Sequence, residues 1–126
     1  MKAVVRLYRL LHGWLLGRYL LLLTTRWRKT GRLRTIAIHY QRHGDVYVLC
    51  ASNAGRAGHP AWLHNLRADP KVIVQVGSRR SACQAGEPQE EERDSLWAAW
   101  VARDPGYLRM SRRVGRTFPL ITLRCP

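Results

Sequence analysis

Short runs of strand-forming residues, separated by turn residues, constrain the fold of this chain more than any other feature of its sequence. The runs Arg34–Gln41 and Val46–Ala51 flank His43-Gly44-Asp45, a short glycine-containing turn that is typical of a β-hairpin. Four further runs predict strands: Leu20–Thr24, Val72–Val76, Arg79–Ala85 and Phe118–Leu123. The pattern therefore predicts a mostly antiparallel sheet of about six strands, which is compatible with a small barrel.

Three segments have the features of helices. Residues 2–16 carry apolar side chains at helical spacing on one face and basic side chains on the other. This amphipathic helix either covers the core or lies at an acidic lipid surface, and its short polar face favours the core. A second helix is predicted from Pro60 to Ala68, and a third from the acidic run after Pro88 to Asp104. Together with the strands, these helices indicate an α+β fold.

Positive charge is concentrated at the start of the chain. The 126 residues include 22 Lys and Arg against 8 Asp and Glu, a formal net charge of +14, and the first 44 contain ten basic side chains and no acidic one. Because crowded like charges repel one another, such a segment predicts an anionic partner: a nucleic acid, an anionic lipid or a small polyanion. Five of the ten form a first basic cluster: Arg26, Arg28, Lys29, Arg32 and Arg34. A second basic cluster is interpreted as a solvated surface: Arg109, Arg112, Arg113 and Arg116.

The cysteines and the apolar runs exclude several other classes. Cys50, Cys83 and Cys125 are odd in number and far apart, and no Cys or His pair has metal-ligand spacing, so neither a disulfide nor a zinc site is predicted. We expect reduced thiols in a cytoplasmic protein. Arg18 divides the apolar N-terminal run, which is therefore too short to cross a membrane and unlike a signal peptide.

Lys29-Thr30-Gly31, inside the first basic cluster, has the composition of an anion-binding loop. Arginine forms bidentate contacts with phosphate, lysine adds a point charge, and glycine lets backbone N–H groups approach the anion. The segment is not a P-loop, because the first glycine of that motif is missing.

A second candidate site lies where the strand that ends at Ala51 is followed by a glycine-rich loop and a helix. Ser52 and Asn53 begin the loop, and Trp62 and Asn65 share one face of the helix. Such a corner offers free N–H groups, an amide and an aromatic surface for a phosphate or a polarised carbonyl. The alternatives are that Trp62 is a core aromatic residue and that Ser52 and Asn53 are ordinary turn residues.

No set of side chains for nucleophilic or acid–base catalysis is apparent in the sequence. Four of the eight acidic residues lie within Glu87–Glu92, so paired catalytic carboxylates are poorly supported. A cofactor that supplies its own reactivity would account for this composition.

Several motifs follow one another in an order that is shared with a known family: Leu20-Leu21-Leu22-Leu23-Thr24-Thr25, Arg28-Lys29-Thr30-Gly31, Arg34, Ala51-Ser52-Asn53, His59-Pro60-Ala61-Trp62, Asn65-Leu66, Pro70, Val74-Gln75-Val76-Gly77, Pro105-Gly106-Tyr107, Gly115-Arg116-Thr117 and Phe118-Pro119. This series, within residues 17–124, resembles the deazaflavin-dependent nitroreductase family, whose members use reduced coenzyme F420. The resemblance implies a small split β-barrel of the FMN-binding type. The expected organisation is an N-terminal amphipathic helix, residues 1–16, and a split-barrel cofactor-binding domain, residues 17–126.

The resemblance also implies roles for the two candidate sites. Two residues are expected to be catalytic, Ser52 near the deazaflavin ring and Tyr107 near the acceptor. The phosphate and acidic tail of the cofactor are assigned to one loop: Arg28, Lys29, Thr30, Gly31 and Arg34. The rest of the cofactor site is assigned to the following residues: His39, Ala51, Ser52, Asn53, Trp62 and Asn65. No metal ligand is expected.

Five positions depart from the pattern of the resembled family. Trp27 replaces a usual glycine, Ala37 stands where proline is common, and His39 stands where a tyrosine or an aliphatic residue is usual. Asp104 and Met110 occupy positions that are tyrosines in the prodrug-activating nitroreductase. The cofactor loop is therefore mostly kept, whereas the wall that faces the substrate differs.

The sequence thus predicts an oxidoreductase that transfers a hydride from reduced coenzyme F420 to an electron-poor small molecule, which is a quinone, an enone or a nitro compound. The first alternative is an FMN-dependent oxidoreductase on the same barrel. The second is a basic nucleic-acid-binding module, which is less favoured because Trp27 alone interrupts the first basic cluster with an aromatic side chain. We further expect a homodimer that contacts the anionic inner face of the plasma membrane peripherally. We expect no binding to a specific nucleic acid.

Overall fold

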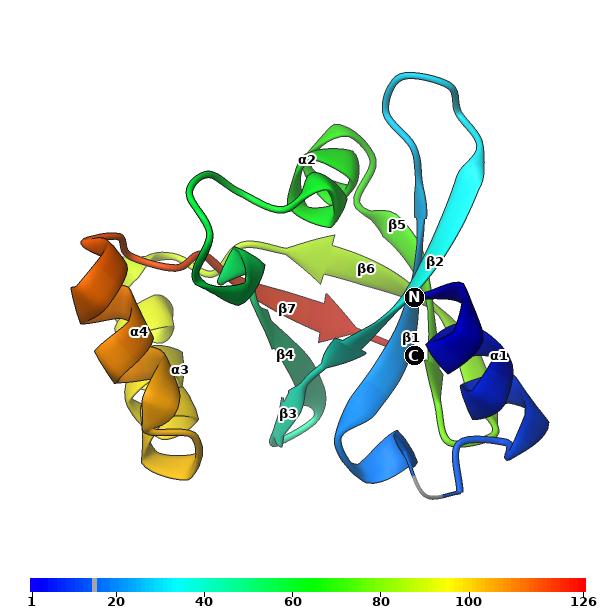
Figure 1. Cartoon of the computed structure of the whole chain (residues 1–126), viewed down its shortest axis with the longest axis horizontal. Helices are drawn as coiled ribbons and strands as arrows, with labels where there is room; N and C mark the ends of the chain where they lie inside the picture. Colours follow the sequence, from blue (N-terminus) through cyan, green and yellow to red (C-terminus); the bar gives the residue numbers. More distant parts are fainter. Residues whose placement is uncertain (15) are drawn as a thin grey trace.

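The computed structural model describes residues 1–14 and 16–126 and shows a curled antiparallel sheet with helices on two sides (Figure 1). The strands are β1 (Leu20–Arg26), β2 (Leu33–His39), β3 (Gln41–His43), β4 (Val46–Cys50), β5 (Lys71–Val76), β6 (Arg79–Gly86) and β7 (Leu120–Arg124). The α-helices are α1 (Lys2–Leu10), α2 (Ala61–Ala68), α3 (Glu90–Arg103) and α4 (Gly106–Val114), and two short 3₁₀ helices are η1 (Leu16–Arg18) and η2 (Asn53–Gly55). The predicted α+β class is confirmed.

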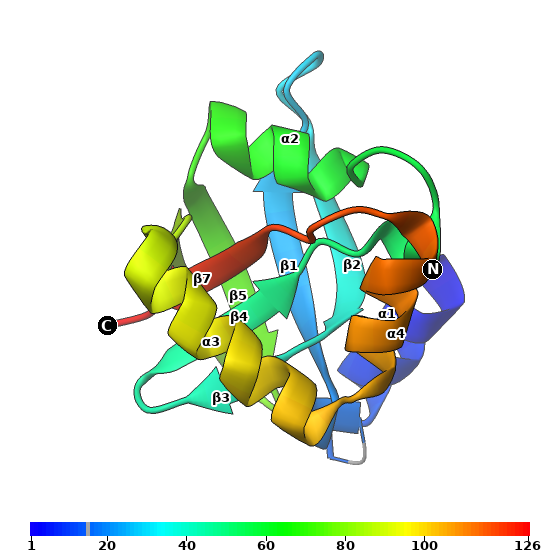
Figure 2. The same cartoon turned by 90° about the vertical axis from the view of Figure 1, so that its left-hand side faces the viewer.

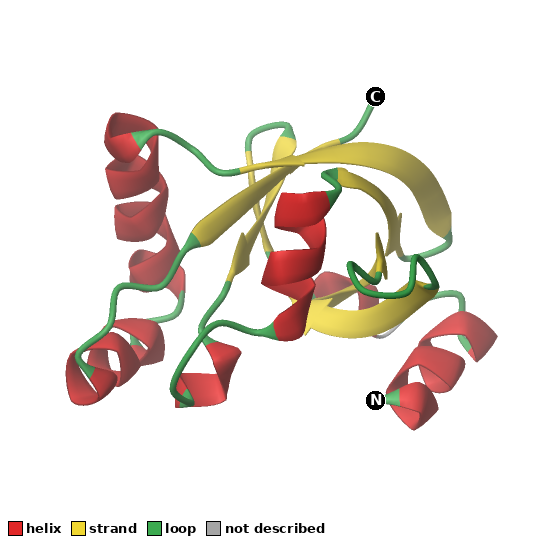
Figure 3. Cartoon of the chain, turned by 90° about the horizontal axis from the view of Figure 1, so that it is seen from above, coloured by secondary structure: helices red, strands yellow, loops and turns green. Residues whose placement is uncertain are grey.

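The two edge strands of the sheet, β2 and β3, are separated in the chain by Tyr40 alone. The strand order is β2-β1-β5-β6-β7-β4-β3, so the sheet has to curl until its two edges approach each other, as the view from above shows (Figure 3). The predicted single strand Arg34–Gln41 is therefore wrong in one respect. It consists of two strands with different partners, β1 and β4, which raises the number of strands from about six to seven.

The concave face of the sheet forms the main core. Leu21 and Leu23 of β1 point to the same face and pack, fully buried, with Leu49 and Ile121 from the other half of the sheet. Burying each such side chain stabilises the fold by about 1.5–3 kcal/mol. Helix α2 packs Leu63 onto this cluster and covers one end of the barrel (Figure 2).

Helices α3 and α4 lie side by side against β4 and β7, on the opposite side of the molecule from α1 (Figures 1 and 2). Trp100 of α3 is fully buried and packs with Phe118 and the outer face of β4. The predicted helix up to Asp104 is confirmed, but α4 was not predicted. The dipeptide Pro105-Gly106 indicates a turn, and the arginines that follow obscure the helical spacing of the apolar residues.

The N-terminal helix ends earlier than its predicted bound, residue 16, because the chain turns at His12 and Gly13. Both residues have positive φ angles, 51° and 69°. A Cβ atom at Gly13 would lie 2.4 Å from the Cα atom of Gly77, so only glycine fits this close approach. Leu15, which the helix was predicted to include, lies outside the described residues. Tyr8 is fully buried and its hydroxyl accepts a hydrogen bond from Gly77 N at 2.8 Å, so the preferred interpretation of a helix packed on the core is confirmed.

The expectation of three reduced thiols is wrong, because Cys83 and Cys125 form a disulfide with their Cα atoms 4.4 Å apart. Gln84 of β6 pairs with Arg124 of β7 in an antiparallel ladder, so Cys83, before Gln84, lies opposite Cys125, after Arg124. This pairing between strands distant in sequence was not visible from cysteine spacing. Cys50 is a buried free thiol.

Among the residues that the structure describes, no helix has both the length and the apolar character needed to cross a membrane.

Candidate functional site

A pocket of about 410 Å³ opens beside β2, and elements from distant parts of the chain form its wall. β2 supplies one side, the end of β4 and the loop after it a second, the start of α2 a third and the first turn of α4 a fourth. The lining residues are Met1, Ile36, Ala37, Ile38, His39, Cys50, Ser52, Asn53, Ala54, Arg56, Pro60, Trp62 and Tyr107. We call this the β2 pocket.

Five of the residues proposed from the sequence come together in the β2 pocket: His39, Ser52, Asn53, Trp62 and Tyr107. Ala51 and Asn65 do not line it. Ala51 is fully buried in the core, and Asn65 is a buried residue of α2 itself. Arg28, Lys29, Thr30 and Gly31 lie in the loop between β1 and β2, which projects beyond the body of the barrel, and Arg34 follows it as the second residue of β2 (Figures 1 and 2).

The loop between β1 and β2 is closed by backbone hydrogen bonds. Trp27 N donates to Arg32 O at 2.7 Å, and Gly31 N donates to Trp27 O at 2.8 Å. Gly31 has a φ of 73°, which glycine adopts without strain. Arg26 reinforces the turn from one side, because its Nη1 donates to Gly31 O at 2.7 Å.

Asn65 connects this loop to α2. Its Oδ1 accepts hydrogen bonds from the backbone N of Arg28 at 3.2 Å and from Arg28 Nη1 at 3.4 Å. Its Nδ2 lies 3.5 Å from the hydroxyl of Thr25. The amide of Asn65 is thus used to hold the basic loop against α2, a role that its position on the helix did not reveal.

The cations of the loop are largely free to bind an anion. Among the described residues, no carboxylate lies within 4 Å of the side chains of Arg28, Lys29 or Arg34, whereas Arg26 pairs with Asp69 at 3.7 Å. The guanidinium carbon of Arg34 lies 4.3 Å from the centre of the Trp27 ring, which orients this side chain. Trp27, one of the departures from the family pattern, therefore serves as a platform for arginine.

Tyr107 is half-buried at the mouth of the β2 pocket. Burial, with smaller contributions from Cys50 and Asp104, raises the pKa of its phenol to about 12. Its ring stacks on His39, with ring centres 6.2 Å apart, and meets Trp100 edge to face at 5.3 Å. At neutral pH the phenol is therefore a hydrogen-bond donor held in one orientation.

Cys50 also lines the pocket but is not a nucleophile. Burial raises the pKa of its thiol to about 12, and the weaker opposing effects of Arg93 and Arg116 do not compensate. The thiolate is the reactive form of cysteine, and this side chain is not ionised near neutral pH.

The loop after β4 carries an unusual backbone. Asn53, Ala54 and Gly55 have φ angles of 55°, 55° and 76°, three consecutive residues in the left-handed region. Ser52 has a right-handed helical backbone conformation, and Asn53, which follows it, has a left-handed one. This alternation turns successive backbone N–H groups toward one side, which is a known arrangement for binding anions. The sequence signal that could have located this turn is the dense run of Asn, Ala and Gly.

Several pocket residues were missed by sequence reasoning: Met1, Ile36, Ala37, Ile38, Cys50, Ala54, Arg56 and Pro60. Most of these side chains are apolar and carry no chemical signature. Met1 reaches the pocket because α1 packs on β2, where the Met1 thioether accepts a hydrogen bond from Ala37 N at 3.2 Å.

The chain matches the model of the F420H(2)-dependent quinone reductase family over residues 1–124. It is 34% identical over 106 residues to an F420H(2)-dependent quinone reductase of Mycobacterium tuberculosis strain H37Rv, and the match covers 82% of this chain and 71% of the relative.

Two solved structures have a similar fold, and the match covers nearly all of each of those chains. An F420-H2 dependent reductase, FDR-A, superposes with a TM-score of 0.77 at 30% identity, covering 85% of this chain and 95% of that one. A protein described as a domain-swapped dimer has a TM-score of 0.80 at 28% identity, covering 98% and 95%. The predicted split-barrel fold is confirmed by the first of these structures.

Proposed function

The chain belongs to the F420H(2)-dependent quinone reductase family, and we propose that the β2 pocket and the basic loop between β1 and β2 are the site at which it carries out this activity. It is an oxidoreductase that uses coenzyme F420 and reduces a quinone, as predicted. The observation that carries the assignment of the site is the convergence of five residues, proposed from the sequence, on one pocket.

The residues present fit the chemistry of the cofactor. Its phosphate and acidic tail are polyanionic, and Arg28 and Lys29 of the loop, with Arg34 at the start of β2, form an uncompensated cationic group beside α2. Thr30 and Gly31 complete the turn of this loop. Within the pocket, Trp62 supplies a flat aromatic wall and Ser52 and Asn53 supply polar groups for the deazaflavin ring.

When bound, reduced coenzyme F420 supplies a hydride, so the protein has to orient the acceptor and furnish the proton that completes the reduction of a quinone to a hydroquinone. Tyr107 is the proposed donor to the acceptor oxygen, because its phenol remains protonated at neutral pH. Ser52 is the second proposed donor, near the ring. A positioned donor stabilises the negative charge that develops on oxygen in the transition state.

Oxidation of reduced F420, followed by its absorbance with a quinone, an enone and a nitroaromatic acceptor, tests this proposal. We expect turnover of the quinone that is lost in the Trp62→Ala variant and retained in Arg79→Ala, an exposed cation remote from the pocket. Equal activity of Trp62→Ala and the parent would place the site elsewhere. The FMN alternative predicts tight binding of FMN without binding of F420, and the family assignment does not favour it.

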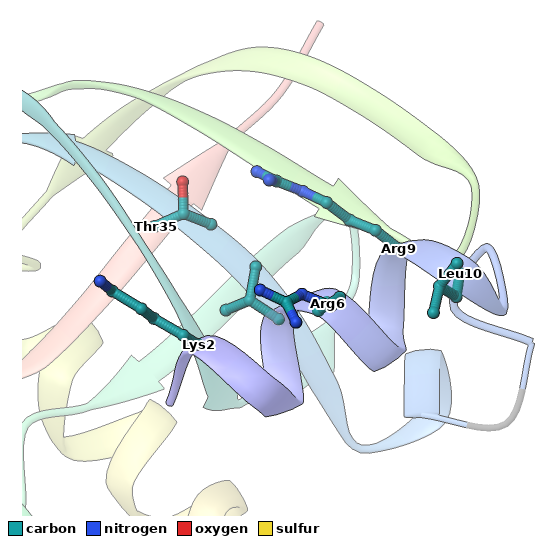
Figure 4. Close-up of a pocket in the computed structure, with 6 residues that line it drawn as sticks. Lys2, Arg6, Arg9, Leu10 and Thr35 are labelled. Carbon is teal, nitrogen blue, oxygen red and sulfur yellow. The ribbon is translucent and has the colours of Figure 1, made fainter.

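Helix α1 packs Val5 and Tyr8 on the core, and we also propose that its exposed face makes peripheral contact with the anionic cytoplasmic face of a membrane. Eight large apolar side chains are exposed in the described residues, and seven of them lie at the N-terminus: Met1, Val4, Leu7, Leu10, Leu11, Trp14 and Tyr19. Lys2, Arg6 and Arg9 border a groove of about 430 Å³ between α1 and Thr35 of β2 (Figure 4). Apolar side chains next to basic ones, without acidic neighbours, suit an interface with acidic lipid.

Flotation with vesicles tests the membrane proposal. We expect binding to vesicles that contain phosphatidylglycerol, weaker binding to pure phosphatidylcholine, and loss of both in the Leu7→Gln/Trp14→Gln variant. Leu33→Gln removes the eighth exposed apolar side chain, on β2, and serves as the matched control. Binding of the double variant at the parental level would contradict the proposal.

We also propose a homodimer, because one structural neighbour is described as a domain-swapped dimer. Light scattering coupled to size-exclusion chromatography would give twice the monomer mass of 14.6 kDa. A monomeric mass over a wide concentration range would contradict this proposal.

A further inference from the structure

Arg116 lies in the segment that joins α4 to β7, and its side chain contacts the loop after β4. The sequence pattern, by contrast, favours a solvated basic surface for Arg116. Its Nη2 donates to the carbonyl oxygen of Ser52 at 2.9 Å and to that of Arg56 at 3.0 Å. Its Nη1 lies 3.4 Å from Nδ1 of His59. One guanidinium group therefore contacts the beginning, the middle and the end of the loop that forms one wall of the β2 pocket.

The position of this guanidinium is fixed by its own surroundings. Its central carbon lies 4.9 Å from the ring centre of Phe118, which is fully buried. Its backbone is tied to α4, because Arg116 N donates to Ser111 O at 3.2 Å and the Ser111 hydroxyl donates to Arg116 O at 2.7 Å. Arg116 does not itself line the pocket.

The contacted loop needs such support. Asn53 and Ala54 are held at positive φ, a conformation that residues with a Cβ atom rarely adopt, and the segment that follows contains two glycines. Burial, followed by the charges of Arg67 and Arg116, lowers the pKa of His59, so its neutral ring can accept a hydrogen bond from Arg116. Without the hydrogen bonds from Arg116, a loop of this composition would sample many conformations.

We propose that Arg116 is a positioning residue that holds Ser52 and Asn53 in their binding conformation before any ligand arrives. The inference rests on the proposed function of the β2 pocket, since Ser52, Asn53 and Ala54 line it. By ordering the loop in advance, Arg116 removes an entropic cost from ligand binding. It acts through the backbone and touches neither cofactor nor acceptor.

Hydrogen exchange of the ligand-free protein gives the first test, because it needs no cofactor. In Arg116→Lys, which keeps the charge but not the planar fork, and in Arg116→Gln, we expect amides 53–58 to exchange at least tenfold faster. Amides of β4 and β7 serve as the internal reference for folding. Arg112→Lys, an exposed arginine on α4, is the matched control and leaves amides 53–58 unchanged. Parental exchange of these amides in both Arg116 variants would overturn the proposal.

The second test measures the dissociation constant of F420 by titration. We expect it to rise about tenfold or more in the Arg116 variants, and Ala54→Gly, which relieves the positive φ, to recover part of the loss in the Arg116→Lys background. Faster exchange with parental affinity would also overturn the proposal. If the parent itself binds no F420, the proposed function fails, whereas the exchange data still report whether Arg116 orders the loop.

Discussion

Nε2 of His39 lies 2.9 Å from Oδ2 of Asp104. Both residues occupy positions at which the chain departs from the resembled family, so the two departures form a single contact between β2 and the corner that joins α3 to α4. The same carboxylate oxygen accepts a hydrogen bond from Gln41 Nε2 at 2.7 Å. Because Tyr107 follows Asp104 by three residues and stacks on His39, this contact fixes one wall of the β2 pocket.

The contact predicts a defined loss of stability in acid. Burial is the largest effect on Asp104 and opposes its ionisation, but hydrogen bonds from His39 and Gln41 and the charges of His39 and Arg103 outweigh it and lower its pKa below the ordinary value of 3.8. A carboxyl whose pKa is lowered by folding stabilises the folded state above its unfolded pKa, and this contribution disappears as the pH falls through the folded value.

The variant Asp104→Asn tests this by urea unfolding at several pH values. We expect it to be less stable than the parent at pH 7, by no more than about 1 kcal/mol because both partners are about one-third exposed. The difference should narrow as the pH falls below 3.8. A difference that stays constant with pH would show that the charge of Asp104 contributes nothing to it.

Removing single cations from the loop between β1 and β2, or from the start of β2, should weaken cofactor binding without slowing the reaction. For Lys29→Ala and Arg34→Ala we expect a free-energy loss of about 1–3 kcal/mol each, the usual cost of a charged hydrogen bond. The maximal rate at saturating F420 should change little, since the loop lies outside the β2 pocket. Titration and steady-state kinetics separate the two effects, with Arg79→Ala as the control. A large fall in the maximal rate at parental affinity would assign these side chains to the reacting centre.

Local patterns predicted most of the strands, the helices α2 and α3 and the composition of both candidate sites, because turn residues and helix ends act over a few residues. The division of residues 34–41 into two strands could not be predicted, since it depends on the closure of the sheet at Tyr40. The contacts of Asn65 and Arg116 were hidden for a similar reason. Each side chain forms a hydrogen bond with backbone that is distant in sequence. The type of a residue alone does not show whether it contacts the backbone or a ligand.

The disulfide between Cys83 and Cys125 should contribute measurably to stability. It closes a loop with a sequence separation of 42, and the chain-entropy estimate for such a loop is up to about 4 kcal/mol at 25 °C. We expect Cys83→Ser, or treatment of the parent with a reductant, to lower the midpoint of thermal unfolding. Reductant should have no effect on Cys83→Ser, which serves as the control. An unchanged midpoint in the reduced parent would show that the pairing of β6 with β7 needs no covalent support.

The substitution Tyr107→Phe removes one hydroxyl from the β2 pocket and leaves the ring that stacks on His39. If the phenol donates a proton or a hydrogen bond to the acceptor oxygen, kcat should fall at least about tenfold, or about 1.4 kcal/mol, while the affinity for F420 is retained. The raised pKa, about 12, adds a second expectation. Ionisation of this phenol should not lower kcat of the parent between pH 7 and about 10, because the proton is lost only at higher pH. Tyr19→Phe, an exposed tyrosine, is the matched control. Turnover of Tyr107→Phe at the parental rate would leave the ring with a packing role and the hydroxyl with none in catalysis.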